Sequence, residues 1–155
     1  MDNHIQSVDV QETVNAVLLQ VEPQLAAKGV DDVGDIPADI RVAADPEKLH
    51  QILLELVSNA IKFTERGGYV MVDVGFPLGM PADVVMIRVT DSGSGIPREK
   101  ADEIFEPSAL RTQAASVVGH GLAICRALAR GMGGDIRVRS DEGQGAVFTL
   151  TLPRG

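Results

Sequence analysis

Residues 45–63 read DPEKLHQILLELVSNAIKF and predict an amphipathic helix. Aspartate is a favoured N-cap, and proline fits the first turn, where its missing amide hydrogen costs no helical bond. Apolar residues then recur at helical spacing, at Leu49, Ile52, Leu53, Leu56, Val57 and Ala60. This stretch therefore predicts a helix with one face packed on the core of the domain.

Three polar residues of this helix share a second face, beside the apolar one. Glu55, Asn59 and Lys62 are spaced at i, i+4 and i+7. Carboxylate and amide oxygens are hard ligands that suit Mg²⁺, and a lysine ammonium group can meet a phosphate as a point charge. The pattern indicates a metal–phosphate site, although an ordinary solvated edge with a Glu/Lys pair explains it equally well when it is taken alone.

A glycine-rich segment, DSGSGIP at residues 91–97, follows a predicted strand. Glycines let a backbone approach a ligand closely, and the acceptor-only carboxylate of Asp91 suits recognition of an amino group. The dinucleotide-binding fingerprint needs a third glycine where Arg98 stands, which disfavours that class of site. A plain turn with an aspartate cap is the structural alternative.

A second glycine-rich segment, GHGLAI at residues 119–124, is expected to open the last helix after a loop at 106–119. Free amides at a helix N-terminus bind anions, and the helix dipole adds to the attraction. A glycine-rich helix entry without a ligand is the alternative.

The rest of the chain alternates between strands and helices. A strand at 8–10 leads into a helix that is capped by Asp9 and stopped by Gly29, and Pro23 is expected to end or kink this helix early. Strands are expected at 40–43, 69–76, 84–90, 135–139 and 147–152, and helices at 98–104 and 122–132. Hairpin-length links between strands favour an α+β fold, a two-layer sandwich of a mixed, mostly antiparallel sheet with helices on one face.

Composition limits the class of protein. The 155 residues carry a net charge of −8, which disfavours binding to nucleic acid or to anionic membranes. Cys125 is the only cysteine, so no disulfide can form within the chain. Residues 8–155 are expected to form one domain after seven linker residues, without direct membrane contact.

Four segments occur together in an order that is specific to one family. ELVSNAIKFT at 55–64 resembles the asparagine box of sensor histidine kinases, and DSGSGIP resembles their first glycine box. IFEP at 104–107 resembles the phenylalanine box, and GHGLAI resembles the second glycine box. From about Val8 onward the chain therefore resembles the catalytic and ATP-binding domain of bacterial two-component sensor histidine kinases, within the Bergerat-fold (GHKL) superfamily that also holds gyrase, Hsp90 and MutL-type ATPases.

The resemblance implies roles for residues on the first two boxes. Asn59 would hold Mg²⁺ against the triphosphate, Lys62 would contact phosphate, and Glu55 would polarise the attacking group as the catalytic residue. Asp91 would accept a hydrogen bond from the adenine amino group. Gly93 and Gly95 would let the chain pass close to the base, and Ile96 would pack near it.

The resemblance also implies a lid over the phosphates, formed by residues 106–119. Arg111 is the expected contact of the lid with the γ-phosphate. Further nucleotide contacts are expected from the second glycine box, at Gly119, His120, Gly121 and Leu122.

The implied reaction transfers the γ-phosphoryl group of MgATP to a histidine of a dimerisation domain, within a two-component phosphorelay. His4, His50 and His120 lie outside any helical hairpin pattern, so the acceptor histidine is expected on a domain absent from this chain. A response regulator or receiver domain would be the next partner. The expected location is the cytoplasm, including the cytoplasmic part of a membrane-anchored sensor.

The second glycine box departs from the family pattern. Relatives usually read GTGLGL, whereas residues 117–122 read VVGHGL, the segment 107–121 is shorter than expected, and Ser108 stands where an aromatic residue is common. Two alternatives stay open: a degenerate nucleotide-binding or regulatory module, and a Ser/Thr kinase of the anti-sigma type with the same fold. A hydrolytic gyrase-like ATPase would need an additional transducer domain.

Overall fold

The computed structural model describes residues 3–77, 79, 83–93, 115–140 and 145–155, and for residues 115–120 it describes the backbone alone. The helix expected at 98–104 and the IFEP segment lie outside this part of the chain.

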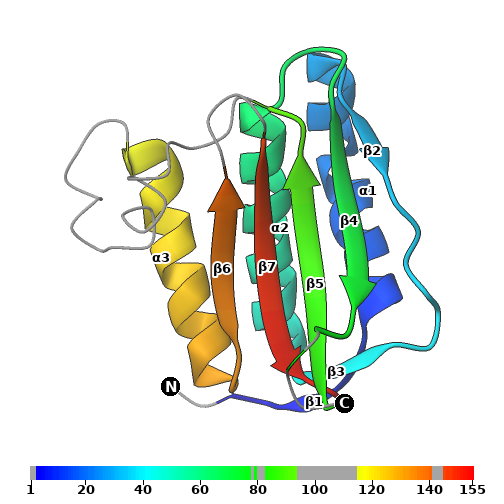
Figure 1. The fold of residues 1–155 in the computed structure, drawn as a ribbon, viewed down its shortest axis with the longest axis vertical. Helices are drawn as coiled ribbons and strands as arrows, with labels where there is room; N and C mark the ends of the chain where they lie inside the picture. The colour runs from blue at the N-terminus through cyan, green and yellow to red at the C-terminus, as the bar shows by residue number, and fades with distance from the viewer. Residues whose placement is uncertain (1–2, 78, 80–82, 94–114, 141–144) are drawn as a thin grey trace.

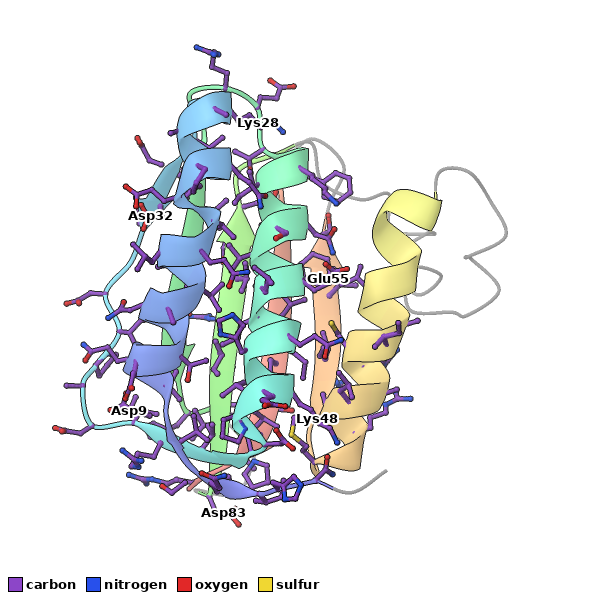
Figure 2. The ribbon with its side chains drawn as sticks, turned by 180° about the vertical axis from the view of Figure 1, so that it is seen from behind. Asp9, Lys28, Asp32, Lys48, Glu55 and Asp83 are labelled. Atoms are coloured by element: carbon purple, nitrogen blue, oxygen red, sulfur yellow. The ribbon has the colours of Figure 1, made fainter. Side chains whose placement is uncertain are left out.

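The chain folds into two layers, a twisted sheet and a layer of helices that covers one of its faces (Figure 1). The sheet has the strand order β2-β4-β5-β7-β6, and β2 and β4 pair in parallel while the other neighbours are antiparallel. These strands are β2 (Asp31–Val33), β4 (Tyr69–Gly75), β5 (Val84–Asp91), β6 (Asp135–Ser140) and β7 (Ala146–Pro153). The helices are α1 (Val10–Lys28), α2 (Pro46–Phe63) and α3 (Ala115–Gly131), and α2 lies between the other two (Figure 2). The predicted α+β sandwich is confirmed.

A small second sheet joins the start of the chain to the start of α2. In it β1 (Gln6–Asp9) pairs antiparallel with β3 (Arg41–Ala44). Asp9 caps α1 by accepting a hydrogen bond from the Glu12 amide, as the sequence predicts. Asp45 caps α2 in the same way, because its Oδ1 accepts from the amides of Glu47 and Lys48.

The central helix α2 buries the predicted apolar residues, and it packs against both α1 and α3. Its buried side chains face an aliphatic core to which β5 and β7 contribute alternate residues. Phe148 is the largest side chain in that core with no exposed surface.

The prediction that Pro23 would end α1 early is wrong, since α1 continues to Lys28 and ends at Gly29 in the left-handed conformation. The buried apolar residues of α1 continue at helical spacing on both sides of Pro23, with Val21 before it and Leu25 after it. A proline inside a helix costs about 3 kcal/mol, and packing of this continuous stripe offsets that cost. Pro23 itself lies on the exposed face.

The predicted start of the last helix near Leu122 is also wrong. Helix α3 begins at Ala115, so the second glycine box lies inside it. Two glycines in a helix cost about 1 kcal/mol each, and the packing of α3 on α2 and β6 compensates for them. Leu122, Cys125 and Ala129 form the buried side of α3.

Candidate nucleotide site

Asn59 occupies the most unusual position on α2, because its side chain is polar and yet 0% exposed. Neither Oδ1 nor Nδ2 has a hydrogen-bond partner within the described part of the chain. A buried polar group without a partner costs about 1–3 kcal/mol. The pattern of the sequence placed Asn59 only at the edge of the core, so its complete burial is new. A buried amide without a partner in the described part of the chain is available to bind a ligand.

Asp91 presents a second group of this kind at the end of β5, where it is 2% exposed. Its Oδ1 accepts a hydrogen bond of 2.9 Å from the Gly93 amide, and its buried Oδ2 has no partner among the described residues. Burial raises the pKa of this carboxyl group, and the amides of Gly93 and Ala146 act in the opposite direction. The carboxylate therefore keeps one oxygen available as an acceptor in a protected position.

Gly93 joins the Asp91 turn to the end of α2. A Cβ atom at Gly93 would lie 1.8 Å from the carbonyl oxygen of Phe63, so no other residue fits without moving the backbone. Gly145 approaches the same turn, since a Cβ there would lie 2.1 Å from the Asp91 carbonyl oxygen. The Gly93 contact places the end of β5 against the end of α2, and the Gly145 contact places the start of β7 beside the same turn. Whether Gly93 also lies close to a base stays a prediction.

Two further residues support this region, and the sequence analysis assigned them no role. Thr64 is fully buried directly after α2, and its hydroxyl group donates a hydrogen bond of 2.7 Å to the Ala60 carbonyl. Lys28 extends its ammonium group from the end of α1 to the carbonyls of Ile61 and Lys62, at 2.8 and 2.6 Å. The cation stabilises the negative end of the α2 dipole. A basic residue in the last turn of α1 was the only signal for Lys28 in the sequence.

Glu55 lies on the side of α2 that faces α3 (Figure 2). Its side chain is half-buried, and a Cβ atom built on Gly121 of α3 would lie 1.4 Å from its Oε1. The thiol of Cys125 is also near, because burial and then the charge of Glu55 raise its pKa to about 12. Glu55 and Asn59 thus line one side of α2, one turn apart.

The sequence from β3 to the last residue, residues 44–155, matches the family described as histidine kinase-, DNA gyrase B- and HSP90-like ATPases. The chain belongs to this ATPase family. Among curated relatives, it is 38% identical over 141 residues to the adaptive-response sensory kinase SasA of Synechococcus sp. (strain JA-2-3B'a(2-13)), which covers 89% of this chain and 37% of SasA. It is 42% identical over 122 residues to the aerobic respiration control sensor protein ArcB of Escherichia coli K12, covering 76% of this chain and 15% of ArcB. The chain therefore spans less than two fifths of either protein.

Solved histidine kinase structures share the fold of this ATPase domain. Full-length ShkA in complex with AMPPNP superposes with a TM-score of 0.85 at 29% identity, over 100% of this chain and 32% of ShkA. ThkA in complex with the response regulator TrrA superposes with a TM-score of 0.79 at 27% identity, over 97% of this chain and 42% of that one. The fold and the family together make this chain a catalytic ATPase domain of the histidine kinase type.

The structure brings together some of the predicted site residues of this ATPase domain, but not all of them. Glu55 and Asn59 lie together on α2, while Asp91 and Gly93 meet the end of α2. Lys62 is exposed in the last turn of α2. Gly95, Ile96 and Arg111 lie outside the described residues.

The second glycine box lies differently from the prediction. Gly119, His120 and Gly121 come after the first turn of α3, where an amide bonds to the carbonyl four residues earlier. Their amides are therefore not the free N-terminal groups that we expected for phosphate binding. Leu122 is fully buried in the core.

Metal binding at this site would depend on few protein ligands. Within the described ranges, no group of three His, Cys, Asp or Glu side chains is placed to hold a metal ion. The unpartnered Oδ1 of Asn59 fits one position of a magnesium shell, and Mg²⁺ characteristically takes its other ligands from phosphates and water.

No helix in the described part of the chain is long and apolar enough to cross a membrane.

Proposed function

We propose that this ATPase domain binds MgATP and donates the γ-phosphoryl group to a histidine on a separate dimerisation domain. The observation that carries the proposal is that Asn59 and Asp91 are both buried and both have polar side-chain atoms without a partner among the described residues. The close approach of Gly93 to Phe63 places the turn after Asp91 against the end of α2, the helix that carries Asn59. Each of the two buried side chains costs folding free energy in the isolated chain, and each has the chemistry that one part of the nucleotide needs.

In this proposal Asp91 recognises adenine, because Oδ2 accepts a hydrogen bond from the amino group while Oδ1 is held by Gly93. Asn59 provides an oxygen ligand to Mg²⁺, which when bound neutralises charge on the phosphates. Lys62, exposed at the end of α2, contacts phosphate. A histidine ring nitrogen is already a nucleophile, so the protein contributes mainly positioning and charge compensation, with Glu55 orienting the attacking ring.

Two of the similar structures support the choice of ligand and partner. ShkA holds AMPPNP, an ATP analogue, and ThkA is bound to the response regulator TrrA. We extend both to this chain and propose a response regulator or receiver domain as the protein that takes the phosphoryl group onward. The supply of ATP favours the cytoplasm as the location.

The test is phosphoryl transfer from γ-labelled ATP to a dimerisation hairpin supplied as a separate protein. Acid-labile, alkali-stable label on the hairpin is the expected result, and Asn59→Ala should abolish it. Asn15→Ala, on the exposed face of α1, is the matched control and should leave the label unchanged. Nucleotide binding without transfer to hairpins of several kinase families would contradict the proposed reaction.

A second candidate function is a regulatory module that binds nucleotide without transferring phosphate. The observation that favours it is α3, which runs as a helix from Ala115 through a second glycine box with an altered sequence. In that case ADP and ATP analogues bind, no phosphohistidine forms, and signalling in the parent protein survives Glu55→Gln. The kinase proposal predicts loss of signalling in the same variant.

A further inference from the structure

Helix α3 crosses the Glu55 side chain at Gly121. A Cβ atom built on Gly121 would lie 1.4 Å from Oε1, 2.3 Å from Cδ and 2.8 Å from Cγ of Glu55. Side-chain carbons do not approach other heavy atoms within 3.0 Å, so this conformation of Glu55 requires glycine at position 121. Gly121 does not adopt a positive φ, and the requirement is therefore one of space and not of backbone conformation.

Cys125 lies on the same face of α3 as Gly121, one turn later, and it is also near the Glu55 carboxylate. Cys125 is four residues after Gly121, so the two share one side of the helix. The charge of Glu55 contributes, after burial, to the raised pKa of the Cys125 thiol. Within the described part of the chain, no hydrogen bond or ion pair holds Glu55, and packing against α3 therefore decides where its carboxylate points.

We propose that Gly121 is a positioning residue for Glu55. The missing Cβ leaves the space in which the carboxylate lies, and the contact fixes its direction beside Asn59, one turn further along α2. This inference rests on the proposed function, in which Glu55 orients the attacking histidine. It replaces the expected role of Gly121 as a free helix-terminal amide that binds phosphate.

Substitution of Gly121 by alanine should move Glu55 without unfolding the domain. Alanine is the better helix former, and the atom closest to the new Cβ is the end of a flexible side chain. Glu55 then rotates to another rotamer. The three heavy atoms nearest to that Cβ all belong to Glu55 and none belongs to Asn59 or Asp91, so the affinity for nucleotide should change little.

The contact itself is tested by thermal unfolding of four proteins without nucleotide: wild type, Gly121→Ala, Glu55→Ala and the double variant. With alanine at position 55 the clash is absent, and Gly121→Ala should raise Tm by about 2–4 °C through helix propensity. With Glu55 present this gain should disappear. An equal shift in both backgrounds would show that the two residues do not interact, and it would overturn the proposal.

The functional part is tested with the same four proteins and a fifth, which combines Glu55→Asp with Gly121→Ala. The assays are labelling of a supplied hairpin at saturating MgATP and calorimetric titration of ADP. Gly121→Ala should lower the transfer rate at least tenfold with the ADP Kd within twofold. Gly121→Ala should have no further effect on the transfer rate when residue 55 is already alanine. In the Gly121→Ala protein, Glu55→Asp should restore part of the lost transfer rate, because the shorter side chain leaves room for the new Cβ.

Two outcomes count against the proposal in different ways. If Gly121→Ala weakens ADP binding tenfold whichever residue stands at 55, Gly121 acts on the nucleotide directly and the positioning role is overturned. If the wild type itself binds no nucleotide, the proposed function fails and takes the catalytic positioning with it, while the Tm comparison still decides whether the contact exists.

Discussion

Replacement of Asn59 by leucine should stabilise the nucleotide-free domain while it destroys the site. Leucine has a similar branched shape, and it removes the two buried polar atoms that lack partners in the described part of the chain. A side-chain amide that is buried without partners costs about 1–3 kcal/mol as a whole. We expect the free energy of unfolding to rise by about 1–3 kcal/mol for Asn59→Leu, which is a rise in Tm of about 3–9 °C for a domain of this size.

The assay is urea denaturation without nucleotide, with equal m values required so that the change reflects stability alone. Asn15→Leu is the control, because Asn15 is exposed on α1 and its substitution should change the free energy of unfolding by no more than about 0.5 kcal/mol.

Addition of nucleotide should reverse the order of stability of the two proteins. A ligand at one thousand times its Kd stabilises the folded state by about 4.1 kcal/mol, which exceeds the advantage of Asn59→Leu, and only the wild type should gain this from MgATP. If Asn59→Leu is less stable than the wild type by more than about 1 kcal/mol without nucleotide, Asn59 is satisfied in solution and the reasoning fails.

Three more substitutions test neighbouring features. Because burial raises the pKa of Asp91, the ionised form of this carboxyl group opposes folding. Asp91→Asn should therefore be more stable than the wild type by urea denaturation. This advantage should be absent near pH 3.8 or below, grow as the pH rises through the raised pKa and then level off. Gly93→Ala should lower the free energy of unfolding by about 1–3 kcal/mol, since the new Cβ would meet the Phe63 carbonyl oxygen, and an unchanged urea midpoint would contradict the close contact. Lys28→Met should lower the free energy of unfolding by about 1 kcal/mol in the same assay, because two carbonyl groups at the end of α2 lose their hydrogen bonds to the ammonium group. A loss that shrinks little at high salt would assign the effect to the hydrogen bonds, and a loss that disappears would assign it to the charge at the end of the helix dipole.

Local signals in the sequence were enough to predict α2 with its cap and the strands that flank it. The Asp45 cap and the regular apolar spacing agree with each other, and both act within a few residues. The order of the glycine boxes then placed the site at the ends of α2 and β5, and the structure brings Asp91 and Gly93 to that place.

The errors came from features that depend on packing between distant segments. Proline usually ends or kinks a helix, but in α1 the buried apolar stripe continues past Pro23. The two glycines near residue 120 suggested a helix start, whereas contact with α2 keeps them inside α3. The distance along the chain between Glu55 and Gly121 hides their contact from any local pattern, and for the same reason the full burial of Asn59 was not predictable.

Calorimetric titration of the wild-type chain with ADP and with a non-hydrolysable ATP analogue, each with and without Mg²⁺, tests the central claim most directly. We predict that both nucleotides bind, that Mg²⁺ strengthens the binding of the triphosphate, that Asn59→Ala removes this dependence on Mg²⁺, and that Asp91→Asn weakens both nucleotides. Absence of heat with either nucleotide, or affinities that neither substitution changes, would contradict the assignment of Asn59 and Asp91 to one nucleotide site.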